Sequence, residues 1–98
     1  MNPLSIVNLT VNFIKEGRQV IAYAPALDIS TVGNSVEHAK SRFQELVKMF
    51  MADISERHVI DDVLTELGWT KAQIAPQTKP QWVPPSVTSI DLQVPIAA

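Results

Sequence analysis

The sequence predicts a single α+β domain over residues 1–98: an antiparallel three-strand meander and a returning C-terminal strand, packed by one long amphipathic helix and a second, shorter helix. Three observations predict this class. Apolar residues alternate with period two in the first third of the chain and again near residue 90, they recur at steps of three and four in between, and Pro and Gly mark the changes. The expected order is β-β-β-α-α-β.

The first strand is predicted within PLSIVNLTVNFI, residues 3–14. From Asn8 onward it alternates, with Leu9, Val11 and Phe13 on one face, which is typical of a partly buried strand. The polar turn KEGR follows, where Gly17 can take a positive φ, so we expect a hairpin.

The second strand, QVIAYA, ends at a proline. It has apolar residues on both faces, with Ile21 and Tyr23 opposite its valine and alanines, as expected of a strand covered on both sides. Pro25 lacks the amide proton that a ladder needs and is tolerated at strand ends, so it stops this strand. ALD then makes a turn, and ISTV is long enough for a third strand that completes the meander.

A long amphipathic helix is predicted over residues 36–54. Gly33 and Asn34 end the third strand, and Ser35 is a favourable N-cap with Glu37 in the first turn. Apolar residues then form one stripe at helical spacing: Val36, Ala39, Phe43, Leu46, Val47, Phe50 and Ile54. Burying this stripe on the sheet stabilises the fold by roughly 1.5–3 kcal/mol per large side chain, which makes this helix the main packing element.

A second helix, a proline-rich segment and a last strand complete the domain. ERHVIDDVLTELGW, residues 56–69, predicts the shorter helix, with Gly68 at the C′ position and Trp69 packing back on the last turn. Four prolines in residues 69–85 favour an extended segment without regular structure. SIDLQVPI, residues 89–96, alternates again, and we expect it to return to the sheet as the fourth strand.

Composition narrows the functional classes. Eight Lys and Arg against ten Asp and Glu give a net charge of -2. The basic residues are scattered, so we expect no direct nucleic-acid binding. The absence of cysteine excludes disulfides, thiolate metal sites and thiol nucleophiles. No apolar stretch approaches the ~20 residues of a membrane span, and the sequence starts without a signal-like segment, so we expect a soluble, cytoplasmic protein with no membrane partner.

A longer pattern links these elements. A tyrosine–proline stretch follows the hairpin, and a glycine, a polar cap and a helix with an early alanine come after it: Ala22, Tyr23, Pro25 and Leu27, then Gly33, Ser35, Glu37 and Ala39. Together with the closing SIDLQVPIA, this pattern resembles the HicB-type antitoxin domain over almost the whole chain.

The resemblance implies a fold and a function. It implies a degraded RNase H-like sheet with helices and without nuclease activity. It also implies an antitoxin that binds and masks a small HicA-type mRNA-cleaving toxin. Many members of the family carry a DNA-binding domain as well, but no helix-turn-helix or ribbon-helix-helix segment follows the last predicted strand, so we expect none in this chain.

Residues that suggest chemistry have simpler interpretations. A two-metal nuclease site needs several converging carboxylates, whereas the predicted strands offer only Asp28 and Asp91. His38 and His58 lie on different helices and lack the short spacing of metal ligands. Ser35 has no nucleophile elbow around it, and its capping role explains it. We therefore expect no enzyme, no cofactor and no metal.

A partner-binding surface is predicted instead. One helix covers only one face of a small sheet, which leaves Ile21 and Tyr23 on the other, and Trp69 and Trp82 add large aromatic side chains near flexible segments. Either the second helix and the proline-rich segment cover this surface or another chain does.

We expect this other chain to be a second copy, in a homodimer, or a small basic toxin whose charge complements that of this protein. The alternative is an orphan homo-oligomeric scaffold or ligand-binding protein that has kept the fold. The sequence leaves the role of residues 76–85 open.

Overall fold

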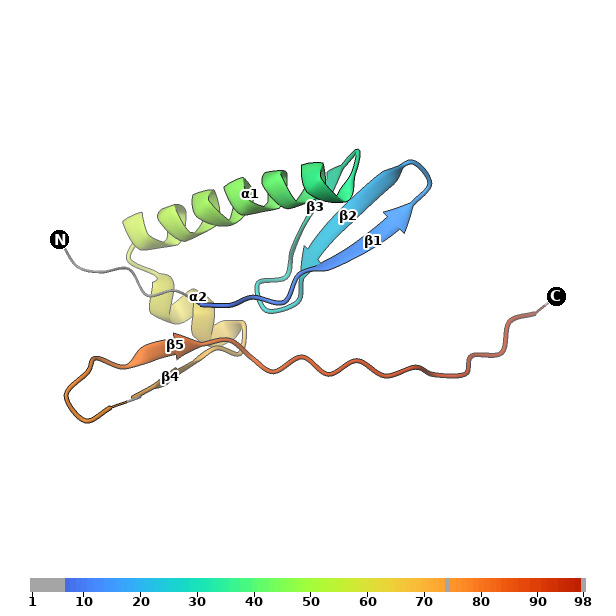
Figure 1. The fold of residues 1–98 in the computed structure, drawn as a ribbon. Coiled ribbons are helices and arrows are strands. Elements are labelled where there is room, and N and C mark those ends of the chain that lie inside the picture. Colours follow the sequence, from blue (N-terminus) through green and yellow to red (C-terminus); the bar gives the residue numbers. More distant parts are fainter. Residues whose placement is uncertain (1–6, 74, 98) are drawn as a thin grey trace.

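The computed structural model describes residues 7–73 and 75–97. Its elements are β1 (Asn12–Glu16), β2 (Gln19–Ala24), β3 (Ile29–Gly33), α1 (Val36–Glu56), α2 (Ile60–Glu66), β4 (Thr70–Ala72) and β5 (Gln81–Val83). Three antiparallel strands, a long helix, a short helix and a final pair of strands confirm the predicted α+β class and order (Figure 1). Among the described residues, no helix combines the length and the apolar character that crossing a bilayer requires.

The first three strands form the predicted meander, with β2 between β1 and β3. Gly17 has a φ of 61° in the turn between β1 and β2. β2 ends at Ala24, directly before Pro25, as the proline predicts. β1 begins later than the alternation indicates, at Asn12, because residues 7–11 do not pair in the sheet and Leu9 and Val11 pack against the two buried clusters. Residues 3–6 of the predicted strand lie outside the described residues.

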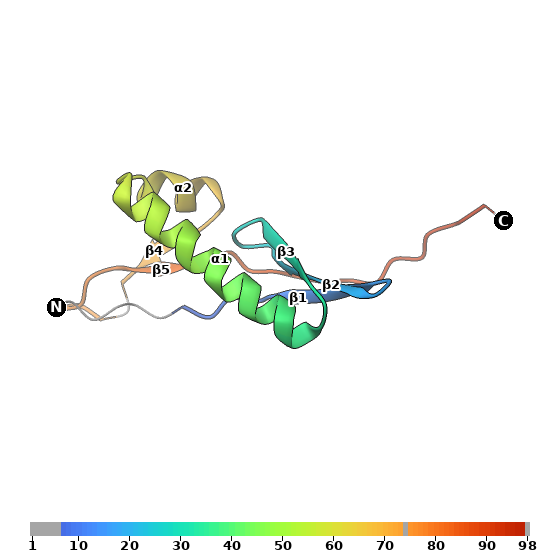
Figure 2. The ribbon, with the colours of Figure 1, turned by 90° about the horizontal axis from the view of Figure 1, so that it is seen from above.

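The long helix confirms the prediction over residues 36–54 and extends to Glu56. The backbone N–H of His38 donates to Ser35 Oγ at 3.1 Å, so Ser35 is the N-cap. Gly33 ends β3 directly against the first turn of α1, where a Cβ would overlap the backbone of Ala39. Glycine is needed at this position for space. α1 then crosses the strands obliquely (Figure 2).

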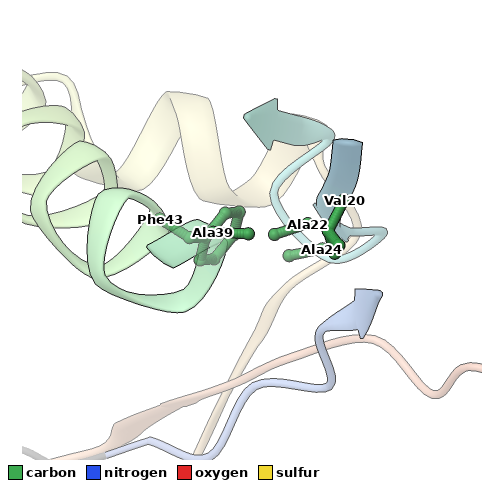
Figure 3. Packing of buried hydrophobic residues seen from close by; sticks show 5 residues of the cluster. All are labelled: Val20, Ala22, Ala24, Ala39 and Phe43. Carbon is green, nitrogen blue, oxygen red and sulfur yellow. The ribbon is translucent and has the colours of Figure 1, made fainter. Parts of the chain in front are cut away.

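Small side chains line the contact between α1 and the sheet. Ala22, Ala24 and Ala39 are completely buried, and Val20 and Phe43 close the cluster on either side (Figure 3). Alanine at facing positions lets a helix approach a sheet closely, so this core is thin.

A second buried cluster joins the turn after Pro25 to both helices. Ala26 and Leu27 from this turn are each 3% exposed and pack with Ile54, Leu64 and Trp69. The turn is therefore an interior element, although the sequence suggests only a short connection.

The short helix and the segment after it differ from the prediction. α2 spans only residues 60–66, and Gly68, with a φ of 92°, takes the predicted C′ position. Residues 69–85 are not without regular structure: β4 and β5 pair antiparallel, with Thr70 opposite Val83 and Ala72 opposite Gln81. The prolines permit this hairpin because none of the four lies within either strand.

The predicted fourth strand does not form. Residues 87–97, which we call the C-terminal tail, contain no strand or helix, and their apolar side chains are exposed. The tail leaves β5 and runs past the meander on the side of β1 without pairing with it (Figure 1). The alternation of apolar and polar residues predicts that this segment can form a strand, but it does not specify which other strand the segment would pair with. The final strands are β4 and β5 instead.

Candidate interaction surface

The three-stranded sheet has one face under α1 and one face that points away from it. On β2, Val20, Ala22 and Ala24 point to the helix and are buried, whereas Ile21 and Tyr23 alternate to the other side and are only partly buried. We call this second side the open face. The structure thus places Ile21 and Tyr23 where the sequence predicts them.

A row of apolar side chains crosses the open face. The register pairs Ile14 with Ile21 and Ile21 with Val32, so the three side chains are neighbours on adjacent strands. Ile14 is 51% exposed and Val32 is 40% exposed. Neither residue was predicted from the sequence to lie on this surface. The short turn at Gly17 could have identified Ile14, because turn length fixes the register of a hairpin.

Tyr23 extends this row toward the turn after β2. Its hydroxyl donates to Asp28 Oδ1 at 3.1 Å. This hydrogen bond raises the pKa of Tyr23 above its usual value, and desolvation and the negative charge of Asp28 act in the same direction. Asp28 has a φ of 53°, a left-handed conformation that aspartate tolerates better than most residues. The ring of Tyr23 is therefore held in place at the end of the open face.

The charged groups on the open face are acidic. Glu16 lies on the same side of β1 as Ile14, and Asp28 lies beside Tyr23. Lys15, the one basic residue of the three strands, pairs with Val20 and thus alternates to the helix side. An apolar row with a carboxylate on either side of it, Glu16 toward one turn and Asp28 toward the other, suits a partner that has an apolar patch bordered by basic groups.

Trp69 is not on this surface. It is 6% exposed, and its Nε1 donates to the backbone oxygen of Ala26 at 2.8 Å, within the second buried cluster. The expectation that Trp69 is available to a partner needs correction, because the turn after Pro25 occupies its indole. The sequence could not show this contact, which joins residues 43 positions apart.

Trp82 is less buried than Trp69, but it does not lie on the open face either. It is partly buried on β5, with Lys71 Nζ 5.0 Å from the centre of its ring, and it packs at the margin of the second cluster. It borders an apolar groove of about 340 Å³, which Val7, Leu9, Leu27, Val47, Met51, Leu64, Trp69 and Trp82 line. This groove lies apart from the open face, so the structure does not bring Trp82 together with Ile21 and Tyr23.

The polar residues considered for chemistry have structural contacts. Ser35 caps α1, and His38 Nδ1 accepts the backbone N–H of Asn34 at 2.9 Å. His58 follows the end of α1 with a φ of 56°. Within residues 7–73 and 75–97, no three His, Asp or Glu side chains gather as a group that could hold a metal ion.

Comparison with known proteins adds no relative: no family model, no curated protein and no solved structure matches this chain.

Proposed function

We propose that this protein is a HicB-like antitoxin module, a non-catalytic protein that binds a small, basic, HicA-type mRNA-cleaving toxin and covers its active site. The observation that carries the proposal is the open face, with its row of Ile14, Ile21 and Val32 and its acidic ends. Such a row supplies apolar area for burial in a complex, and the carboxylates favour a basic partner.

The mechanism is steric. Contact with the apolar row removes water from the interface, and the bound module keeps RNA from reaching the catalytic groups of the toxin. Glu16 and Asp28 accelerate encounter with a positively charged protein, because complementary fields raise association rates, and salt weakens this effect. No bond is made or broken by the antitoxin.

The residues that carry the resemblance have structural roles that support the proposal. Pro25 ends β2, Leu27 anchors the turn in the core, and Gly33 and Ala39 allow the close approach of α1 to β3. Tyr23 is the exception, because it lies on the open face. The closing SIDLQVPIA, which is part of the resemblance, forms no strand and so does not support the proposal.

The test is co-expression with the protein encoded by the adjacent gene. We expect growth to be restored, the two proteins to copurify, and RNA cleavage by the toxin to stop. In the purified complex, Glu16→Lys lowers the association rate about tenfold at low salt, and the effect fades as salt rises. Glu45→Lys, which makes the same charge change at an exposed position of α1, is the matched control and changes little.

Two results would contradict the proposal. The first is an adjacent protein that is neither toxic nor bound. The second is a complex to which Glu16→Lys and Glu45→Lys are equally harmful, because the open face would then have no special role.

The second candidate is an orphan homo-oligomeric scaffold or ligand-binding protein of the same fold. The exposed apolar side chains of the C-terminal tail favour self-association under either function, so we include a homodimer, acting in the cytoplasm, in both proposals. The groove beside Trp82 offers the apolar lining that a small ligand of the second candidate would need. Absence of a toxin gene together with a stable homodimer selects this candidate.

A further inference from the structure

The C-terminal tail has the alternating pattern of a strand, but it pairs with no strand in the described part of the chain. From residue 90 on, its even-numbered side chains are apolar and exposed: Ile90 72%, Leu92 73%, Val94 68% and Ile96 87%. Ser89, Asp91 and Gln93 alternate with them. In stable proteins, an alternating segment of this kind buries its apolar face. Monomeric proteins rarely expose four large apolar side chains on one side of a segment.

The residues that precede the tail hold its start away from the three-stranded sheet of the same chain. Trp82 holds β5 against the second cluster, and Pro84 and Pro85 follow at once. Pro85 lies beside Gly68, where a Cβ would be 3.5 Å from Pro85 Cβ. Two successive prolines form a stiff, extended exit, so the tail is directed past the meander and does not fold back onto it (Figure 1).

The whole chain is less compact than its length predicts. Its Cα radius of gyration is 16.6 Å, whereas a compact domain of this length has about 13 Å. Its accessible surface is 8207 Å², whereas a compact protein of this mass exposes about 5,500 Å². The excess is more than the roughly 800 Å² that each partner buries in a standard stable interface.

The same chain offers a matching acceptor. β1 is an edge strand: among residues 7–73 and 75–97 no strand pairs with the outer side of its backbone, and all five of its residues are exposed. Next to it an apolar notch of about 360 Å³ opens between β1 and α1, with Val11, Phe13, Val36 and Phe43 in its lining. An edge strand beside an apolar notch readily accepts a further strand.

The tail, as the strand that is donated, and β1, as the strand that accepts it, also agree in length and in the placement of their apolar side chains. Residues 89–94 span about 20 Å as a strand and lie between two proline positions, Pro85 and Pro95, while β1 has five residues. Placed beside β1, Leu92 and its apolar neighbours enter the notch under α1, and Asp91 and Gln93 point to the side of the open face.

We propose that the C-terminal tail of one chain adds as a strand to the β1 edge of a second copy, and that the exchange is reciprocal in a two-fold dimer. A second copy is the occupant that the observations favour, because this chain carries both complementary parts and its proline exit separates them. The inference does not depend on the antitoxin function, since it concerns the β1 edge of the sheet, whereas the proposed toxin-binding surface is the open face.

The first test measures the mass of the full chain in solution by size-exclusion chromatography with light scattering. We expect a dimer at tens of micromolar. Leu92→Asp raises the dimer dissociation constant about 1,000-fold or more, because each dimer loses two buried leucines. Gln93→Asp introduces the same charge on the polar face of the tail and leaves the dimer intact. Unchanged circular dichroism shows that both variants are folded.

The second test separates donor from acceptor. Phe13→Asp damages the β1 notch but keeps a working tail, whereas Leu92→Asp keeps a working notch. We expect each variant alone to be monomeric, and an equimolar mixture to form a heterodimer through the one tail–notch contact that carries neither substitution, with a weaker affinity than the wild-type dimer. A monomeric wild-type chain, a dimer that Leu92→Asp leaves intact, or a mixture of folded variants that stays monomeric would each overturn the proposal.

Discussion

Replacing Trp69 by Phe tests whether the second buried cluster depends on a single hydrogen bond. The indole Nε1 of Trp69 donates to the backbone oxygen of Ala26 at 2.8 Å and ties the turn after β2 to the end of α2. Phenylalanine keeps an aromatic ring at the site but cannot donate this bond. The turn is also the connection that leads into β3, so its anchor affects the whole meander.

We expect Trp69→Phe to lower the free energy of unfolding by about 2–4 kcal/mol. A buried carbonyl left without its donor accounts for about 1–3 kcal/mol. The smaller ring leaves a void beside Leu27 and Leu64, which adds about 1 kcal/mol. This is a large fraction of the 5–15 kcal/mol that is typical of a domain.

The assay is urea unfolding followed by far-ultraviolet circular dichroism, at one protein concentration because dimer formation would stabilise the fold. With a slope of about 1.5 kcal/mol per molar urea, the midpoint falls by about 2 M. Trp82→Phe is the matched control: Trp82 is partly buried and loses mainly its contact with Lys71, so the free energy changes by about 1 kcal/mol or less. Equal shifts for the two variants would refute the reasoning.

Two further predictions follow from local geometry. Gly33→Ala lowers the free energy of unfolding by about 3 kcal/mol, because the added Cβ overlaps the backbone of Ala39. Gly17→Ala lowers it by only about 1 kcal/mol, because Gly17 has open space around it and the cost comes from its φ of 61° alone. Thermal unfolding compares the two variants, and a larger loss for Gly17→Ala would contradict the packing between β3 and α1. Ultraviolet absorbance of the single tyrosine gives a titration midpoint above 10 for Tyr23, and Asp28→Gly, which removes the acceptor and its charge and suits the φ of 53°, lowers it. Because the folded state holds this proton more tightly, the stabilisation is fully present below pH 10 and is lost as pH rises through the folded pKa. A midpoint that Asp28→Gly does not lower excludes Asp28 as the cause of the raised pKa.

The parts of the fold that local signals determine were predicted from the sequence. Gly17 allows a tight turn, Pro25 ends β2 because it lacks the amide proton for a further strand-to-strand hydrogen bond, and Ser35 caps α1. Each of these effects involves only residues close together in the sequence. Ile21 and Tyr23 were placed on the face away from α1 because alternation in a strand fixes the side of every residue once one side is known.

The remaining parts depend on contacts between distant residues. Trp69 lies with Leu64 of α2 in the second buried cluster, in agreement with the packing that Gly68 predicts, but its hydrogen bond joins it to Ala26, 43 positions earlier in the chain. β4 has only three residues, TKA, with no apolar alternation, so only its pairing with β5 makes it a strand. Alternation in residues 89–94 predicts a strand, but the period of a sequence does not identify the neighbour that a strand pairs with.

The two proposals make a joint prediction, because a tail added to the β1 edge would enlarge the open face. With Leu92 in the notch, Asp91 points to the side of Ile14 and adds a carboxylate to those of Glu16 and Asp28. Dimer formation would then strengthen the field that attracts a basic partner. Asp91→Asn should therefore slow toxin association at low salt by a few-fold and leave the dimer intact, whereas Leu92→Asp should weaken both. Toxin binding that is insensitive to both substitutions would show that the open face acts without the exchanged tail, even if the dimer itself is confirmed.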